Sequence, residues 1–207
     1  MKAEELVDLA PVIPVVVLDD PDAAVPLARA LLAGGLPAIE VTLRTESALE
    51  SIERIAAEVP DAVVGAGTIV TPEDAERAAG AGARFLVSPG VTDTLRRAMN
   101  ATGLPFLPGV SSASEAMALL EHDVTVMKFF PAEQSGGAAC LKALYGPLPQ
   151  ITFCPTGGIT TDNAPKYLEL PNVACVGGSW LTPPDAVRKG DWGRIEKLAK
   201  NAAALTR

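Results

Sequence analysis

Eight short apolar runs alternate with stretches of helical pattern along the chain, and this alternation limits the fold more than any other feature. Each run is continuously apolar, as expected for parallel strands that are covered on both faces. The runs are Val12–Leu18, Ala38–Leu43, Val63–Thr68, Arg84–Ser88, Phe106–Gly109, Val124–Phe129, Ile151–Pro155 and Val173–Gly177. The pattern predicts an α/β fold, a single (β/α)8 TIM barrel that forms one domain over residues 1–207.

Helix start signals stand between the runs and support this architecture. The candidate capping residues are Asp20, Thr45, Thr71, Ser112 and either Thr161 or Asp162, and Asp191–Leu205 is expected to form the last helix. Pro26 predicts that the first helix starts late or kinks, because proline fits poorly inside a helix. A doubly wound open sheet is the alternative, but no glycine fingerprint for a nucleotide follows the first run.

Composition argues against several classes of function. The chain is 48% hydrophobic and 20% charged, an ordinary balance for a soluble globular protein. Its net charge of -8 and the lack of a basic run make nucleic acid an unexpected partner, since phosphate binding needs clustered Lys and Arg. No apolar run reaches the roughly 20 residues that cross a bilayer, and the acidic N-terminus is unlike a signal peptide. We therefore expect a cytoplasmic protein that does not bind membranes.

The cysteines and the histidine do not form a metal-binding pattern. Cys140, Cys154 and Cys175 are widely spaced and odd in number, so they are expected to be core residues in a reducing compartment. His122 is the only histidine, which argues against a zinc site or a Ser-His triad. We expect His122 to be an ordinary residue at the end of a helix.

Lys128 is a charged residue inside an apolar, β-branched and aromatic run, residues 124–131. A charge inside a strand is costly unless it is paired. Burial of an amine favours its neutral form, and a neutral amine is a nucleophile towards carbonyl groups. The sequence therefore predicts an enzyme that forms a Schiff base on Lys128. Phe130, two residues later, is a candidate wall of the substrate pocket, although core packing is its simpler interpretation.

Glu40 and Arg44 stand out at the end of another predicted strand. Glu40 lies within the strand, where a buried carboxyl group can exchange protons; a structural ion pair with Lys128 or Arg44 is the alternative interpretation. Arg44 follows four residues later, and arginine binds a planar carboxylate through two parallel hydrogen bonds. Thr68 and Thr156 end other strands and offer hydroxyl groups, although turns and caps are their commoner use.

Glycine pairs follow the seventh and eighth runs, at Gly157-Gly158 and Gly177-Gly178-Ser179. In TIM barrels these two loops often bind phosphate through backbone N–H groups. One such pair is weak support, because it can serve only a tight turn. Two pairs in these two loops indicate a phosphate site that includes Gly178.

These segments occur in the order found in a known family. They are Glu40–Thr45, Gly65–Thr68, Ser88–Gly90, Lys128–Glu133, Pro155–Ile159 and Gly177–Leu181. From about Ile13 to the last helix, the chain resembles the 2-dehydro-3-deoxy-6-phosphogluconate (KDPG) aldolases of the Entner–Doudoroff pathway. Lys-Phe-Phe-Pro-Ala-Glu and Pro-Thr-Gly-Gly-Ile are its most specific segments. Ser111-Ser112 departs from the family, which more often has threonine in this loop.

The resemblance implies a class I aldolase that needs no metal or other cofactor and forms a homotrimer. It assigns the Schiff-base lysine to Lys128, the proton-transferring glutamate to Glu40 and the carboxylate-binding arginine to Arg44. Further substrate contacts fall on Thr68, Pro89, Thr156, Gly157, Gly158 and Ser179. The expected substrate is a phosphorylated keto acid that is cleaved to pyruvate and glyceraldehyde 3-phosphate.

Three alternatives remain open from the sequence. The nearest is a related pyruvate aldolase that acts on the phosphogalactonate epimer or on 4-hydroxy-2-oxoglutarate. A phosphate-binding barrel without catalysis, with Lys128 in a structural ion pair, is the second. A phosphosugar isomerase is the third, and it would release no pyruvate.

Overall fold

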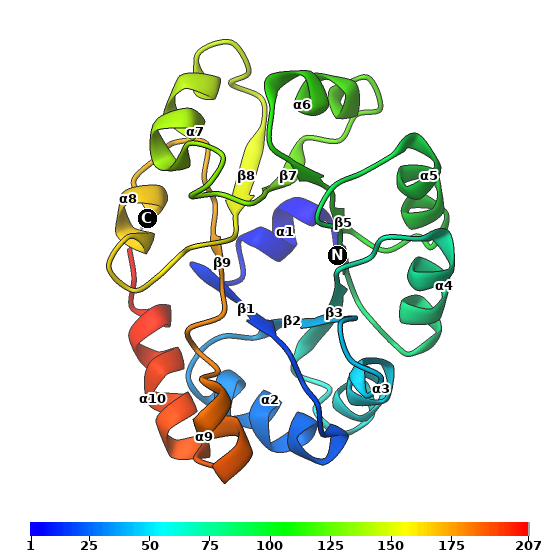
Figure 1. The fold of residues 1–207 in the computed structure, drawn as a ribbon, viewed down its shortest axis with the longest axis vertical. Helices are drawn as coiled ribbons and strands as arrows, with labels where there is room; N and C mark the ends of the chain where they lie inside the picture. The colour runs from blue at the N-terminus through cyan, green and yellow to red at the C-terminus, as the bar shows by residue number, and fades with distance from the viewer. Residues whose placement is uncertain (207) are drawn as a thin grey trace.

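The structure, a computed structural model, describes residues 1–206. Figure 1 shows the strands as a ring with helices around its outside and with the first helix, α1 (Ala3–Val7), across its middle. The strands are β1 Val12–Val16, β2 Ala38–Thr42, β3 Val63–Gly67, β4 Leu86–Val87, β5 Phe106–Leu107, β6 Gly109–Val110, β7 Val126–Phe129, β8 Thr152–Pro155 and β9 Val176–Gly178. The α/β class expected from the alternating pattern is confirmed.

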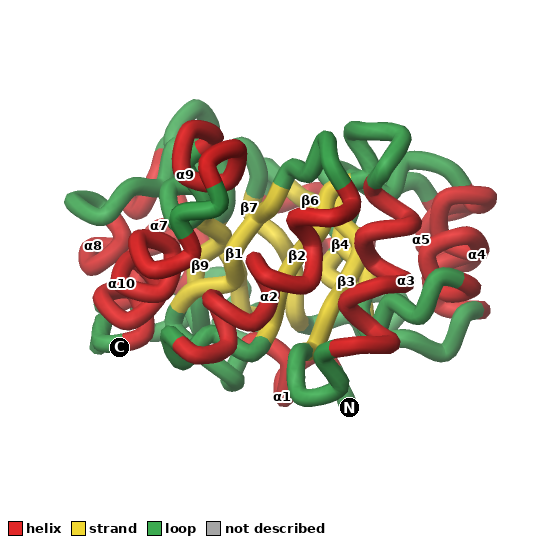
Figure 2. Tube along the Cα trace, turned by 90° about the horizontal axis from the view of Figure 1, so that it is seen from below, coloured by secondary structure: helices red, strands yellow, loops and turns green. Residues whose placement is uncertain are grey.

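A helix or helical turn separates most successive strands. After α1 these elements are η1 Pro21–Ala23, α2 Ala24–Ala33, α3 Ala48–Glu58, α4 Pro72–Gly80, α5 Asp93–Ala101, α6 Ala113–Leu120, α7 Gly137–Tyr145, α8 Ala164–Leu168, α9 Pro184–Lys189 and α10 Trp192–Ala203. Figure 2 shows these helices flanking the strands, with α1 below the strands and α9 above them.

The ladders form two parallel sheets rather than one uninterrupted eight-stranded barrel. The larger sheet has six strands in the order β5-β4-β3-β2-β1-β9, and the smaller has three in the order β6-β7-β8. Isolated bridges, Phe153 to Val173 and Thr156 to Gly177, connect β8 with the segment that contains β9. The predicted strand Phe106–Gly109 is divided at Pro108 into β5 and β6. Proline has no N–H to donate to a ladder, which explains a division at this residue.

Two predicted caps are wrong, and the structure gives the reason in each case. The hydroxyl of Thr45 donates to the carbonyl oxygen of Leu18 at 2.5 Å, and α3 begins after Ser47 instead. Neither Thr161 nor Asp162 caps α8, which follows Asn163. Long-range hydrogen bonds and neighbouring polar residues compete with a local capping signal.

The other start signals are confirmed. Asp20 caps η1, and the hydroxyls of Thr71 and Ser112 accept from backbone N–H groups at the starts of α4 and α6. Asp191 caps α10. The helix with Pro26 starts late, at Ala24, which places the proline in the first turn. Proline is tolerated there because first-turn N–H groups have no partner within the helix.

An apolar cluster fills the inside of the ring at the end covered by α1. It contains Leu6, Val7, Ile13, Ala38, Val63, Phe85, Val87, Leu107, Val126, Cys154 and Cys175. Leu6 and Val7 come from α1, so this helix closes the amino-terminal end of the strands. Cys154 and Cys175 are buried as expected, whereas Cys140 is partly exposed.

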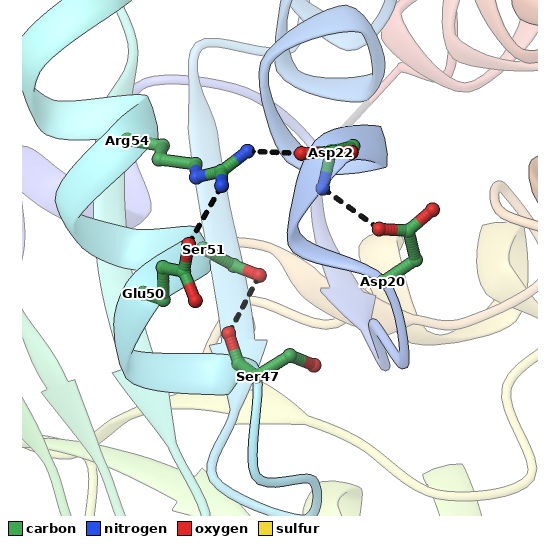
Figure 3. A network of polar contacts seen from close by, with 6 residues as sticks. All are labelled: Asp20, Asp22, Ser47, Glu50, Ser51 and Arg54. Atoms are coloured by element: carbon green, nitrogen blue, oxygen red, sulfur yellow. Dashed lines mark hydrogen bonds and ion pairs between the residues drawn. The ribbon is translucent and has the colours of Figure 1, made fainter.

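A polar network ties η1 to α3 on the outside of the ring (Figure 3). Arg54 of α3 donates to Asp22 of η1 at 2.5 Å and to Glu50, one turn earlier in α3, at 2.6 Å. Asp20 accepts from the N–H of Asp22, and the hydroxyl of Ser51 donates to the carbonyl oxygen of Ser47. The network holds the segment after β1 against the helix after β2.

Candidate active site

A layer of polar side chains lies directly above the apolar cluster inside the ring. Alternate residues of a strand face the same side, so the residue two positions after an inward-facing residue also faces inward. Glu40 follows Ala38 in this way, Lys128 follows Val126, and Thr156 follows Cys154. These strands run in parallel, so the step moves each side chain toward the carboxyl ends of the strands. That is the catalytic end in barrel enzymes.

Lys128 and Glu40 form a buried ion pair across the ring. Nζ of Lys128 lies 3.3 Å from Oε1 of Glu40, and the two side chains are 7% and 4% exposed. Lys128 belongs to β7 and Glu40 to β2, which lie in different sheets. Of the two partners considered for Glu40, the structure therefore pairs it with Lys128. An amine next to a carboxylate in a site with little water can exchange a proton directly with it.

Phe130, two residues after Lys128, lies beside its amine. Nζ of Lys128 lies 5.2 Å from the centroid of the Phe130 ring, within the range of a cation–π contact. Phe129, between them, is fully buried against Phe153. Of these adjacent aromatic residues, Phe129 therefore packs in the core and Phe130 lies beside Lys128.

Two glycines make room for the polar layer. A Cβ atom at Gly67 would overlap with Oε1 and the side-chain carbons of Glu40. A Cβ atom at Gly177 would overlap with the hydroxyl of Thr156. Any side chain at these positions would displace the polar group beside it.

The remaining predicted contacts lie at the rim of the ring. Arg44 follows β2 and is exposed, in a cleft of about 350 Å³ that it shares with Asp74 and Arg77. Thr68 follows β3 with a φ of 62°, a left-handed conformation that is uncommon outside glycine. The backbone of Pro89 packs closely on Gly109, and a Cβ atom at Gly109 would overlap with the Pro89 carbonyl group.

The two glycine turns lie side by side at the same end. The Thr156–Gly177 bridge connects them, and Gly157 and Gly158 have φ values of 100° and 75°. The ring of Trp180 covers Gly178. Ser179 is exposed and lines a cleft of about 400 Å³ between the end of β1 and α9. Exposed backbone N–H groups in such turns form anion sites.

The sequence model of KDPG and KHG aldolases matches residues 3–198. The chain belongs to this aldolase family. A 2-dehydro-3-deoxy-phosphogluconate aldolase of Pseudoalteromonas atlantica is 52% identical, over 99% of this chain and 95% of the relative.

Solved structures of the aldolase family superpose on the whole chain. The KDPG aldolase of Legionella pneumophila, with pyruvate captured as a covalent carbinolamine intermediate, has a TM-score of 0.96 at 44% identity and covers 99% of both chains. The aldolase of Zymomonas mobilis with 3-phosphoglycerate has a TM-score of 0.94 at 48% identity, over 99% of this chain and 96% of that one.

Two further observations concern metal clusters and membrane-spanning helices. Within residues 1–206, no group of three or more His, Cys, Asp or Glu side chains is placed so that it could hold a metal ion. No helix in the same range has the length and apolar character to cross a membrane. His122 follows α6 as expected, with Nε2 3.8 Å from Asp93 at the surface.

Sequence reasoning missed two groups of residues near this site. Asp19, Asp20 and Arg188 line the same cleft as Ser179, but nothing in the local sequence connects them. Tyr167 of α8 donates a hydrogen bond to Glu133, which lies in the loop after β7. The partners are 34 residues apart, so no helical or strand spacing signals their contact.

Proposed function

We propose that the protein cleaves 2-dehydro-3-deoxy-6-phospho-D-gluconate to pyruvate and D-glyceraldehyde 3-phosphate through a Schiff base on Lys128. The observation that carries the proposal is the buried contact of 3.3 Å between the amine of Lys128 and the carboxylate of Glu40. Family membership supports the same chemistry. The related substrate 4-hydroxy-2-oxoglutarate presents the same keto acid to the amine, so cleavage of it is part of the proposal.

Imine formation starts with a proton transfer from Lys128 to Glu40. The neutral amine adds to the C2 ketone and gives a carbinolamine. Glu40 then returns the proton to the departing hydroxyl group, which leaves as water. The product is a protonated imine, and Glu40 is a carboxylate again.

Bond cleavage uses the imine as an electron sink. Glu40, directly or through a water, takes the proton of the C4 hydroxyl as the C3–C4 electrons move toward the imine nitrogen. Glyceraldehyde 3-phosphate leaves, and an enamine remains on Lys128. Glu40 gives the proton it has taken to C3, which forms the pyruvate imine and restores the carboxylate, and hydrolysis frees pyruvate and the amine.

The other predicted residues bind the two ends of the substrate. Arg44 and Thr68 bind the carboxylate beside Pro89, and Phe130 and Thr156 border the reacting carbons. The turns with Gly157, Gly158, Gly178 and Ser179 bind the phosphate. Binding at both ends orients the ketone toward the amine, and this positioning lowers the barrier.

Three wider expectations belong to the same proposal. The two sheets act as one (β/α)8 barrel, because isolated bridges continue the ring from β8 to β9. Residues 1–207 form one aldolase domain. The active form is a homotrimer in the cytoplasm, and light scattering of the purified protein measures its subunit number.

Borohydride reduction with pyruvate tests the central proposal. We expect one pyruvate adduct, mapped by mass spectrometry to Lys128, and loss of both the adduct and cleavage in Lys128→Arg. Lys142→Arg, on α7, is the matched control and should keep the adduct. An adduct on another lysine, or none in the wild type, would refute the Schiff-base assignment.

Glu40→Gln tests the proton transfer separately. We expect it to keep some pyruvate trapping but to cleave the phosphorylated substrate about 10²- to 10⁴-fold more slowly, the usual contribution of a general acid–base group. Measurement of kcat decides, and a kcat equal to that of the wild type would exclude Glu40 from this role.

A further inference from the structure

The loop that follows Lys128 is bonded to the first glycine turn along its length. The N–H of Ala132 donates to the carbonyl oxygen of Thr156 at 2.8 Å, and the N–H of Glu133 donates to that of Gly157 at 3.2 Å. A Cβ atom at Gly157 would lie 3.2 Å from Cα of Pro131. The turn therefore has little freedom to move independently of this loop.

The side chain of Glu133 extends this contact to the second glycine. A Cβ atom at Gly158 would lie 2.6 Å from Cγ of Glu133, so the glutamate packs directly against the backbone of the turn. On the other side of the turn, Nδ2 of Asn163 donates to the carbonyl oxygen of Gly158 at 3.0 Å. The position of Gly158 thus depends on where the Glu133 side chain is held.

A buried tyrosine holds Glu133 in place. The hydroxyl of Tyr167 donates to Oε1 of Glu133, and Tyr167 itself is 1% exposed. Burial, together with the hydrogen bond to Glu133, raises the pKa of Tyr167 above its usual range, so the phenol stays protonated as a donor. Tyr167 lies in α8, which is packed against the core, whereas Glu133 lies in an exposed loop. The buried tyrosine therefore positions the exposed glutamate.

From these contacts we infer that Tyr167 and Glu133 are positioning residues that shape the phosphate-binding turn at Gly157 and Gly158. In this inference neither residue contacts the reacting carbons of the substrate. Their effect passes through the backbone of the turn and falls on the phosphate end of the substrate. The inference rests on the proposed function, in which this turn binds phosphate.

Binding of 3-phosphoglycerate, measured by calorimetry, tests the inference without any need for catalysis. Tyr167→Phe removes only the hydroxyl, and we expect the Kd to rise roughly tenfold, as for the loss of one hydrogen bond to a charged group. Tyr145→Phe is the matched control, since Tyr145 is 40% exposed at the end of α7, and its Kd should equal that of the wild type. Borohydride trapping of pyruvate on Lys128 should be unchanged in both variants.

Glu133→Gln provides a second variant that keeps a hydrogen-bond acceptor. We expect a smaller rise in Kd than in Tyr167→Phe, because a neutral acceptor forms a weaker bond. Glu133→Gln also decides the question if thermal melting shows that Tyr167→Phe does not fold.

The two measurements separate the inference from the proposed function. A Kd in Tyr167→Phe equal to that in Tyr145→Phe, or an equal loss of 3-phosphoglycerate binding and pyruvate trapping, would overturn the inference. A wild type that does not bind 3-phosphoglycerate would overturn it as well. A wild type that binds 3-phosphoglycerate but forms no pyruvate adduct would refute the Schiff-base proposal. The inference would then still be decided by the Kd of Tyr167→Phe for 3-phosphoglycerate.

Discussion

The ion pair inside the ring and the ion pairs of Arg54 on its surface differ in burial far more than in chemistry. Arg54 makes the shorter contacts, 2.5 Å to Asp22 and 2.6 Å to Glu50, but these side chains are 36%, 80% and 52% exposed. Lys128 and Glu40 are farther apart, at 3.3 Å, but are 7% and 4% exposed. Distance alone would thus rank the surface pairs first.

Burial reverses this ranking. Water and ions screen the charges around Arg54, so either partner can lose the other at little cost. Inside the ring, desolvation makes each charge of the pair depend on the other. The same dependence makes the buried pair useful in chemistry, because a proton transfer between its members changes both charges together. Predictions that remove, displace or expose a partner test this contrast.

Removal of one buried partner should have the largest effect on stability. Glu40→Ala leaves the amine of Lys128 buried without a counter-charge, and we expect the free energy of unfolding to fall by about 3–5 kcal/mol. Urea denaturation measures this change. Glu50→Ala, which removes an exposed partner of Arg54, is the matched control and should remain close to the wild type.

A second substitution checks that the unpaired charge is the cause. Lys128→Met in the Glu40→Ala background removes the amine and should recover part of the lost stability. If the double variant is less stable than Glu40→Ala, lost packing rather than an unpaired charge explains the single variant.

Displacement without removal of charge should have an intermediate effect. In Gly67→Ala the new methyl group takes the place of the Glu40 carboxylate, which must move away from Lys128. We expect kcat to fall about 10²-fold, as for a misplacement of about 1 Å, and stability to fall by about 1–3 kcal/mol. Kinetics and urea denaturation measure the two losses.

Gly80→Ala is the control for this substitution. A Cβ atom at Gly80, the last residue of α4, meets no atom within 4 Å. We expect an unchanged kcat and equal or slightly greater stability, since alanine favours the helix. Equal losses of kcat in both variants would mean that the position of Glu40 does not matter.

The members of the buried pair could be predicted from the sequence, but their contact could be given only as one of two alternatives, since Arg44 was the other possible partner of Glu40. Lys128 and Glu40 each interrupt an apolar strand, and strand order places them at the catalytic end. They are 88 residues apart, and no local pattern indicates that their side chains meet. The interrupted strands identified both residues and the resemblance to aldolases gave their expected roles, whereas only the folded ring gives their geometry.

The same distinction explains the errors in the fold. Helix starts with a local cap, such as Thr71, were predicted correctly because the acceptor and donor lie within one turn. Thr45 was predicted wrongly because its hydroxyl bonds to Leu18, 27 residues away. The division of one strand at Pro108 is visible in the sequence as a missing N–H donor, but which sheet each half joins is decided by tertiary packing.

Removal of the surface pairs should have the smallest effect. Arg54→Met deletes both contacts of the guanidinium and keeps an apolar side chain along α3, so only the ion pairs and their hydrogen bonds are lost. We expect a melting temperature within about 2 °C of the wild type and an unchanged kcat. High salt should remove any remaining difference in melting temperature, because it screens the ion pairs of Arg54 in the wild type. A larger shift that persists in high salt would mean that the network in Figure 3 stabilises the junction of η1 and α3 by packing, and burial would then not be what separates the two kinds of ion pair.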